Sequence, residues 1–275
     1  MSNHDLNAWL GNTEEATDDL GASLLKRVAA TFGVPPLKPG AALPALWHWC
    51  FFQEPVAPSG LGEDGHPARG GFLPPAARRN RMWAGSRVEF IQPLRAGTEA
   101  SRLSTITRIE EKNGRSGQLL FVTVSHEFSQ GGQLCIREEQ DIVYREMTAP
   151  NLAPGDPAPV TQWHETVFPD AVMLFRYSAI TFNGHRIHYD VPYVVDVEGY
   201  PEKVVHGPLI ATLNLQAFLR AHPYAQPRAF NFRGVRPLIA PQPFDVGGAV
   251  LAPGRAQLWA SNDGGLAQIA ELVFD

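Results

Sequence analysis

The chain has 275 residues, of which 44% are apolar and 19% charged, and it carries a formal net charge of −5. This composition allows a packed core and argues against global disorder, while the absence of a long basic run argues against nucleic acid as the main partner. No apolar stretch approaches the roughly 20 residues needed to span a bilayer, so we expect no membrane segment.

The N-terminus and the cysteines suggest a cytoplasmic protein. Residues 1–5 lack a basic region followed by an apolar core, so we expect no signal peptide. Two cysteines, Cys50 and Cys135, fit neither a disulfide framework nor a zinc knuckle. We therefore expect two reduced, buried thiols.

Helical spacing dominates the first part of the chain. Residues 1–34 are predicted to be helical, with Leu20, Leu24, Val28 and Phe32 recurring on one face before the break at Pro35. A second helix is predicted over residues 42–52. A long stretch rich in glycine and proline follows at 54–81, and loops of this length are usually functional or disordered.

Strand patterns begin at Ser86. Apolar alternation and β-branched residues predict an antiparallel meander, with turns at Asn113-Gly114 and Gly131-Gly132, whose strands cover residues 88–91, 100–109, 118–128 and 134–144. Residues 151–159 are typical of a linker. The second half is predicted to contain a helix over 207–219 and strands over 229–238, 254–261 and 266–274.

The two halves share short sequence motifs in the same order. Phe90–Leu94 resembles Gly234–Leu238 at an offset of 144 residues, and the Gly-Gly hairpins at 131 and 264 match at an offset of 133. The difference between these two offsets is explained if the second half lacks the longer hairpin at Asn113-Gly114. Because each meander follows a helix, the pattern indicates a duplicated unit of a helix packed on an antiparallel sheet.

Titratable side chains are most concentrated between residues 183 and 207. On one strand, 183 and 185 would share a face and 188 would oppose them, so Asn183, His185 and His188 converge only across a turn, which Gly184 permits. A histidine can move a proton near neutral pH, and an asparagine can orient a water. His206-Gly207 precedes a helix whose free N–H groups suit a developing oxyanion.

Other interpretations of these residues remain open. His185, His188 and His206 can be structural, or can bind zinc, although no nearby cysteine or carboxylate completes a known spacing. Ser178 lacks the context of a nucleophilic serine, and residues 60–65 lack the Lys-Ser/Thr ending of a phosphate loop. The preferred prediction has no metal.

Arginines and aromatic residues crowd the end of the irregular stretch. They are either a solvated surface or a wall that binds an anionic, extended ligand, and they are Arg69, Arg78, Arg79, Arg81, Trp83 and Arg87.

The second half resembles the MaoC-like hotdog hydratases and dehydratases, whose signature Asp-x-Asn-Pro-x-His precedes a His-Gly at the start of the central helix. Asn183–His188 keeps the final histidine and the spacing, and His206-Gly207 keeps the second element. Gly65–Pro75 and Arg81–Gly85 resemble the N-terminal module of FAS1-like dehydratases. The whole chain is similar to the mesaconyl-C4-CoA and itaconyl-CoA hydratase group and its 3-hydroxyacyl-thioester dehydratase relatives.

This resemblance implies an α+β double hotdog, with two antiparallel sheets that each wrap a central helix. It implies an N-terminal hotdog over residues 1–150 with a degenerate site, and a C-terminal hotdog over 151–275 that carries the catalytic motif. By position, His188 matches the catalytic histidine, and Gly207, beside His206, matches the glycine whose N–H holds the thioester oxygen. Asn183 stands where the wider family has aspartate, and His185 where it has asparagine.

The resulting hypothesis is reversible addition of water to a 2-enoyl-CoA, with mesaconyl-C4-CoA to citramalyl-CoA as the favoured reaction. His188, Asn183 and His185 are the predicted catalytic residues. The predicted substrate-binding residues are Arg69, Arg81, Trp83 and Tyr189. No cofactor is expected beyond the coenzyme A of the substrate, and the predicted state is a monomer that forms a pseudo-dimer, or a homodimer.

Three alternatives were left open by the residues. They are a dehydratase of fatty-acid metabolism acting on 3-hydroxyacyl thioesters, an acyl-CoA thioesterase, and a non-catalytic protein that binds acyl thioesters.

Overall fold

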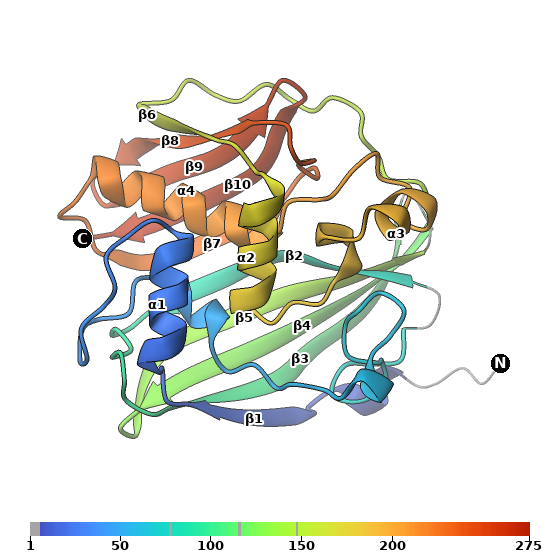
Figure 1. Cartoon of the computed structure of the whole chain (residues 1–275), viewed down its shortest axis with the longest axis horizontal. Helices are drawn as coiled ribbons and strands as arrows, with labels where there is room; N and C mark the ends of the chain where they lie inside the picture. The colour runs from blue at the N-terminus through green and yellow to red at the C-terminus, as the bar shows by residue number, and fades with distance from the viewer. Residues whose placement is uncertain (1–5, 77–78, 115–116, 147) are drawn as a thin grey trace.

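The computed structural model describes residues 6–76, 79–114, 117–146 and 148–275. Their ten strands form one antiparallel sheet in the order β1-β3-β4-β5-β2-β7-β10-β9-β8-β6 (Figure 1). Five strands come from each half of the chain, and β2 pairs with β7 where the halves meet. Within the described residues, no helix has both the length and the apolarity needed to cross a bilayer.

The strands of the first half are longer than those of the second. The first five are β1 (Thr13–Asp18), β2 (Arg79–Phe90), β3 (Ala100–Gly114), β4 (Gly117–Gln130) and β5 (Gln133–Glu146). The second five are β6 (Trp163–Val167), β7 (Pro227–Gly234), β8 (Phe244–Ala252), β9 (Arg255–Asn262) and β10 (Gly265–Phe274). The predicted meander is confirmed for β3, β4 and β5, but β2 lies beside β5 instead of β3.

The helices cover one face of the sheet. The α-helices are α1 (Ala22–Thr31), α2 (Ala171–Ile180), α3 (Val191–Asp196) and α4 (Gly207–Ala221), and the 3-10 turns are η1 (Leu6–Trp9), η2 (Trp47–Cys50), η3 (Pro58–Gly60) and η4 (Arg186–His188). The predicted helix 207–219 corresponds to α4, whose apolar side chains, including Leu215 and Phe218, are buried against the second-half strands. Figure 1 shows α1 beside α2, in front of the sheet.

The first half departs from the predicted helices. Residues 13–18 form an edge strand paired with β3 instead of part of a long helix, and regular helical spacing begins only at Ala22. The predicted helix over 42–52 is reduced to η2, because Pro44 interrupts it and Leu46 has a positive φ of 69°. The buried residues around η2 pack in the main core, so they fill this half without a long helix.

The expected duplication is visible in matching turn hydrogen bonds. The N–H groups of Ile91 and Gln92 both donate to Cys135 O, and those of Val235 and Arg236 both donate to Ala267 O. The pairing of β2 with β7 forms the seam between the halves. There Arg87 lies opposite Asn231, the residue that corresponds to it in the second half at the offset of 144 residues. The halves are therefore related by a pseudo-twofold axis through this pair, and the α+β double-hotdog fold class is confirmed, with its two sheets joined edge to edge.

Close backbone approach at the seam requires a glycine at position 85. A Cβ on Gly85 would overlap the carbonyl oxygen of Phe232 on β7. We expect Gly85→Ala to lower the free energy of unfolding by about 1–3 kcal/mol, the usual cost of overpacking, measured by urea denaturation. Gly71→Ala is the matched control, because an added Cβ there meets no atom within 4 Å. Equal stability of the two variants would contradict the role of the seam.

Candidate active site

The segment with the most titratable groups forms the connection between α2 and α3. Phe182, with a positive φ of 47°, turns the chain away from the end of α2. The Asn183 side chain then accepts a hydrogen bond from the His185 backbone N–H at 2.9 Å. The turn η4 follows and carries His188 into the interior, so the sequence builds the predicted convergence by a loop and a single turn.

His188 is buried and held in one tautomer. Its Nδ1 lies 2.7 Å from the carbonyl oxygen of Val204. Because a carbonyl can only accept, Nδ1 carries the proton and Nε2 keeps its lone pair. Burial lowers the pKa of His188 to about 4, although the bond to Val204 opposes this shift. His188 is therefore a neutral imidazole near pH 7, with a nitrogen that can accept a proton.

His206 supports the ring of His188. The two rings stack with centroids 3.6 Å apart and an interplanar angle of 19°. The Nε2 of His206 lies 2.8 Å from Ser178 Oγ on α2. Burial, and secondarily His188, hold the pKa of His206 well below its ordinary value. We infer that His206 fixes the position of His188 from the first residue before α4.

The start of α4 meets the same cavity. Gly207 is the first residue of the helix, and Gln268 Nε2 donates to its carbonyl oxygen at 2.9 Å. Among the described residues, no backbone acceptor pairs with the Gly207 N–H. Pro208 has no N–H to satisfy, as is common in a first turn. The helix end thus offers an N–H and a partial positive charge to an oxygen in the cavity.

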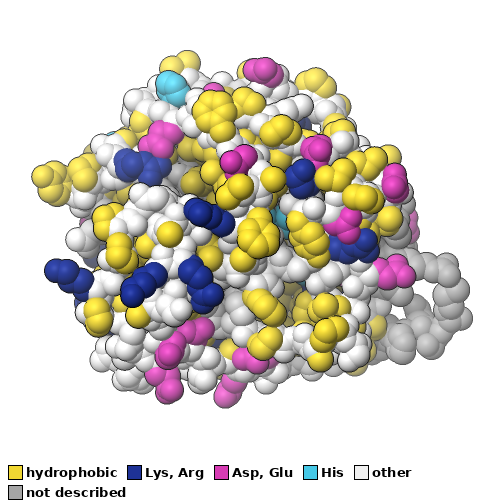
Figure 2. All heavy atoms as spheres, in the orientation of Figure 1, with side chains coloured by type: hydrophobic (Ala, Val, Ile, Leu, Met, Phe, Trp, Pro, Cys, Tyr) yellow, Lys and Arg dark blue, Asp and Glu magenta, His cyan; other side chains and the backbone are white. Residues whose placement is uncertain are grey.

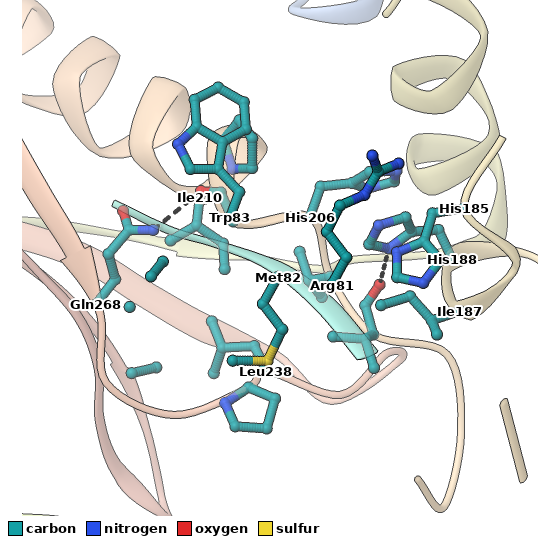
Figure 3. Close-up of a pocket in the computed structure, with 18 of the residues that line it drawn as sticks. Arg81, Met82, Trp83, His185, Ile187, His188, His206, Ile210, Leu238 and Gln268 are labelled. Carbon is teal, nitrogen blue, oxygen red and sulfur yellow. Dashed lines mark hydrogen bonds between the residues drawn. The ribbon is translucent and has the colours of Figure 1, made fainter. Parts of the chain in front are cut away.

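Two adjacent cavities surround these groups. The inner cavity, of about 390 Å³, is lined by His185, His188, Gly207 and Arg81, among others. Figure 3 shows the imidazoles of His185, His188 and His206 grouped on one side of it, with Arg81 alongside. The outer cavity is larger, about 820 Å³, and it shares four lining residues with the inner one, namely His66, Trp83, Asn183 and Pro208.

The predicted substrate-binding residues separate into three groups. Arg81 and Trp83 line the inner cavity, and Tyr189 lines the outer one, where its hydroxyl donates to Gly184 O. Arg69 lines neither cavity: its guanidinium donates to Ala76 O at 2.5 Å and lies 3.5 Å from Asp64. Direct contact between Arg69 and a substrate is therefore not supported.

The remaining arginines of the predicted wall do not form one. Arg87 forms exposed ion pairs with Glu139 and Asp141 on β5. Arg78 and the side chain of Arg79 lie outside the described residues. Of the described arginines predicted from this segment, Arg81 is therefore the one that faces the site.

Two side chains from the irregular first-half stretch were not predicted as site residues. His66 lines both cavities, and its ring lies 4.3 Å from that of His185. Its Nδ1 lies 3.4 Å from Asp64 Oδ2. His66 falls within the Gly65–Pro75 segment that carries the FAS1-like resemblance, but the segment has no periodicity that would predict its contact with His185.

The acid and the histidines of this cluster differ in charge. Burial acts to raise the pKa of Asp64, but hydrogen bonding and charge interaction with His66 outweigh it and hold the pKa well below its usual range. Burial lowers the pKa of His66 to about 4. Burial, and secondarily the neighbouring His66, lower the pKa of His185 further. The site at neutral pH thus contains an ionised carboxylate and neutral imidazoles.

The residues that could bind a zinc ion differ from those expected from the sequence. His188 and His206 stack with nearly parallel rings, and each already has a hydrogen-bonding partner through one nitrogen. Within the described part of the chain, the group whose ligand atoms all lie within 4.8 Å of one another is Asp64, His66 and His185. The predicted trio is therefore not the one that the structure brings together.

Sequence comparison identifies two curated relatives. The chain is 48% identical over 250 residues to the mesaconyl-C(4)-CoA hydratase of Chloroflexus aurantiacus, covering 89% of each chain. It is 27% identical over 228 residues to the mitochondrial hydroxyacyl-thioester dehydratase type 2 of Schizosaccharomyces pombe, covering 73% of this chain and 75% of the relative.

Structural comparison supports the fold. A MaoC-like dehydratase from Phytophthora capsici superimposes with a TM-score of 0.68, covering 100% of this chain and 98% of the other at 14% identity. The family model described as hydroxyacyl-thioester dehydratase type 2 matches residues 46–240. This match spans the seam and the histidine cluster, and with the close curated relative it shows that the chain belongs to the hydroxyacyl-thioester dehydratase type 2 family.

Proposed function

We propose that this protein adds water reversibly to the double bond of a 2-enoyl-CoA. The observation that carries the proposal is the meeting, in one cavity, of the His188 imidazole and the N-terminus of α4. Hydration requires a base for the attacking water and a donor for the developing enolate oxygen. His188 Nε2 and the Gly207 N–H are suited to these two roles.

The proposed reaction balances with one water and one base. His188 Nε2 takes a proton from water while the water oxygen bonds to the β-carbon. The electron pair of the double bond moves toward the thioester, and the enolate oxygen is stabilised by the N–H groups at the start of α4. The imidazolium then returns its proton to the α-carbon. No electron is gained or lost overall, so the proposed reaction requires no redox cofactor.

The proposed substrate carries a free carboxylate on its acyl group. The Chloroflexus relative is named for mesaconyl-C(4)-CoA, and Arg81 provides a half-buried guanidinium in the inner cavity. Burial lowers the pKa of Arg81, with Tyr144 and Asp64 opposing the shift, and an arginine remains charged in proteins. We propose that Arg81 binds this carboxylate and that mesaconyl-C4-CoA is hydrated to citramalyl-CoA.

The outer cavity is the proposed path of the pantetheine arm. Its lining includes the exposed apolar side chains Phe175 and Phe182, together with Tyr189. Figure 2 shows apolar side chains gathered on the face that carries α2 and α3. An extended, weakly polar arm suits such a groove, and its thioester end would reach the inner cavity past His66 and Trp83.

We propose that each half of the chain has its own part in the site. Residues 151–275 would supply the catalytic motif, and residues 1–150 would complete the acyl pocket, so one chain would contain a full site. A monomer is then sufficient for activity, although a homodimer remains compatible with it. We propose a cytoplasmic location for the enzyme.

The acidic limb of the rate profile should report His188. The group acts as a base only when neutral, and burial lowers its pKa to about 4 from 6.5. We therefore expect kcat/KM to stay level from pH 7 to about pH 5 and to fall near pH 4, where the imidazole becomes protonated. Samples held at each pH and assayed at pH 7 control for unfolding. A reversible loss centred near pH 6.5 would contradict the assignment.

A panel of thioesters tests the proposed function. Purified protein is incubated with mesaconyl-C4-CoA, itaconyl-CoA, crotonyl-CoA and a long-chain 2-enoyl-CoA, following enoyl absorbance and free thiol separately. Loss of absorbance without thiol release, greatest with mesaconyl-C4-CoA, is the expected result. Preference for the long-chain substrate would favour the alternative of a 3-hydroxyacyl-thioester dehydratase of fatty-acid metabolism; the Schizosaccharomyces relative is named a hydroxyacyl-thioester dehydratase. Thiol release would favour a thioesterase, and binding without either change a non-catalytic protein.

A further inference from the structure

A loop of the first half is docked tightly onto the catalytic segment of the second. The backbone N–H of Arg186 donates to Asp64 O at 2.9 Å, and its Nη1 donates to Glu63 O at 3.0 Å. Where the two loops cross, a Cβ on Gly65 would overlap the carbonyl of Gly184. This contact needs glycine on backbone grounds as well, because Gly65 has a φ of +84°. The loop position is therefore defined by the second half.

Docking brings an acid–histidine pair to the wall of the site. Asp64 Oδ1 accepts the His66 backbone N–H at 3.0 Å, and Oδ2 lies 3.4 Å from His66 Nδ1. Arg69 approaches the same carboxylate at 3.5 Å. The 3.4 Å approach is a charge contact without hydrogen-bond geometry, and it places the carboxylate beside Nδ1 of the His66 ring. Among the described residues, no hydrogen bond engages His66 Nε2, and the residue lines both cavities.

The attacking water needs two acceptors. One hydrogen is transferred to His188, while the other stays on the oxygen and must be held if a lone pair is to face the β-carbon. Asn183 already accepts from the His185 N–H, and His206 Nε2 is paired with Ser178. The His66 ring lies against that of His185 and lines the same cavity as His188, with the Asp64 carboxylate 3.4 Å from its Nδ1.

We propose that His66, aligned by Asp64, is a further catalytic residue whose Nε2 accepts the second hydrogen of the attacking water. No bond to this hydrogen breaks, and the new hydroxyl group retains it. Asp64 acts as a positioning residue through His66. The inference rests on the proposed hydration, and it assigns a part of the reaction to the first half of the chain.

The electrostatics of the pair agree with this role. Burial lowers the pKa of His66 to about 4, despite the opposing effect of Asp64, so its ring is neutral near pH 7. In a neutral ring, the carboxylate beside Nδ1 favours the tautomer with its hydrogen on Nδ1, which leaves Nε2 as an acceptor. The charged groups facing His66 are Asp64, Arg81 and Arg69, and the neighbouring titratable rings are His185 and His188.

Four variants test the assignment. His66→Ala should lower kcat for mesaconyl-C4-CoA by roughly 10- to 100-fold, the cost expected when a reactant is held in the wrong orientation, with KM within threefold. His66→Gln, which keeps an acceptor, should lose less, and Asp64→Asn should lie between them. Glu63→Gln is the matched control, because it changes an exposed carboxylate of the same loop. Added imidazole should partly restore His66→Ala, a response that lost packing alone does not give.

The outcomes separate this inference from the proposed function. A wild-type protein that hydrates neither mesaconyl-C4-CoA nor crotonyl-CoA refutes the proposed function. If the wild type is active, a His66→Ala variant with kcat within threefold of it, or with no response to imidazole, overturns the role of His66 alone. Stoichiometric metal in the wild-type protein that disappears in His66→Ala would also overturn it, because Asp64, His66 and His185 would then be metal ligands.

Discussion

Replacing His188 by alanine is expected to lower the hydration rate by at least about two orders of magnitude. Deleting the main proton-transfer group costs 10²–10⁴-fold in typical enzymes. The bond from Nδ1 to Val204 O leaves Nε2 as the available base, and the stacked His206 is paired with Ser178 and cannot move into its place without breaking that contact. The measurement is kcat/KM from enoyl absorbance at pH 7.

The control for His188→Ala must separate lost chemistry from lost structure. His164→Ala removes an exposed imidazole from β6, outside both cavities, and should leave the rate unchanged. Circular dichroism and thermal unfolding should show that the His188 variant is folded. A folded His188→Ala protein with activity within threefold of wild type would remove His188 from the mechanism.

Replacing Arg81 by glutamine is expected to change substrate preference more than overall activity. A hydrogen bond to a charged group contributes about 1.5–3 kcal/mol, which corresponds to roughly 10- to 100-fold in kcat/KM. This loss should apply to mesaconyl-C4-CoA, which has a carboxylate on its acyl group, and not to crotonyl-CoA. The measured quantity is the ratio of kcat/KM for the two substrates.

Arg87→Gln is the matched control for Arg81. The two arginines belong to the same strand, but Arg87 pairs with Glu139 and Asp141 on the exposed face. Its replacement should leave the substrate ratio unchanged. Equal losses on both substrates in Arg81→Gln would show that Arg81 maintains the cavity without recognising a carboxylate.

Local signals allowed much of the second half to be predicted from sequence. Gly207-Pro208 marks the beginning of α4 because both residues suit a first turn, and the spacing from Asn183 to His188 required a turn that the structure contains. Strand β8 was missed because Gly247 and Gly248 weaken its β pattern. A Cβ on Gly247 would overlap Trp163 O of β6. A glycine is therefore required here by a contact with a residue that is distant in the sequence.

The first half was harder to predict because its decisive contacts are long-range. The stretch 42–52 has helical composition, yet Pro44 and the left-handed Leu46 allow only η2. Neither Asp64 nor His66 belongs to a periodic segment, and their approach to His185 depends on the crossing of two loops at Gly65 and Gly184. Arg69 and Arg81 looked equivalent in the sequence. Arg81 lies on β2, which pairs with β5 and places this residue in the wall of the inner cavity, whereas Arg69 does not line that cavity.

Incubation with mesaconyl-C4-CoA in ¹⁸O-labelled water, followed by mass spectrometry of the intact thioester, tests the central claim most directly. The expected product is heavier than the substrate by one labelled water, with the label in a hydroxyl group on the β-carbon and with no free coenzyme A. The His188→Ala protein should form this product at least about a hundred times more slowly. An unchanged thioester, or label in a released carboxylate together with free coenzyme A, would contradict hydration at this site.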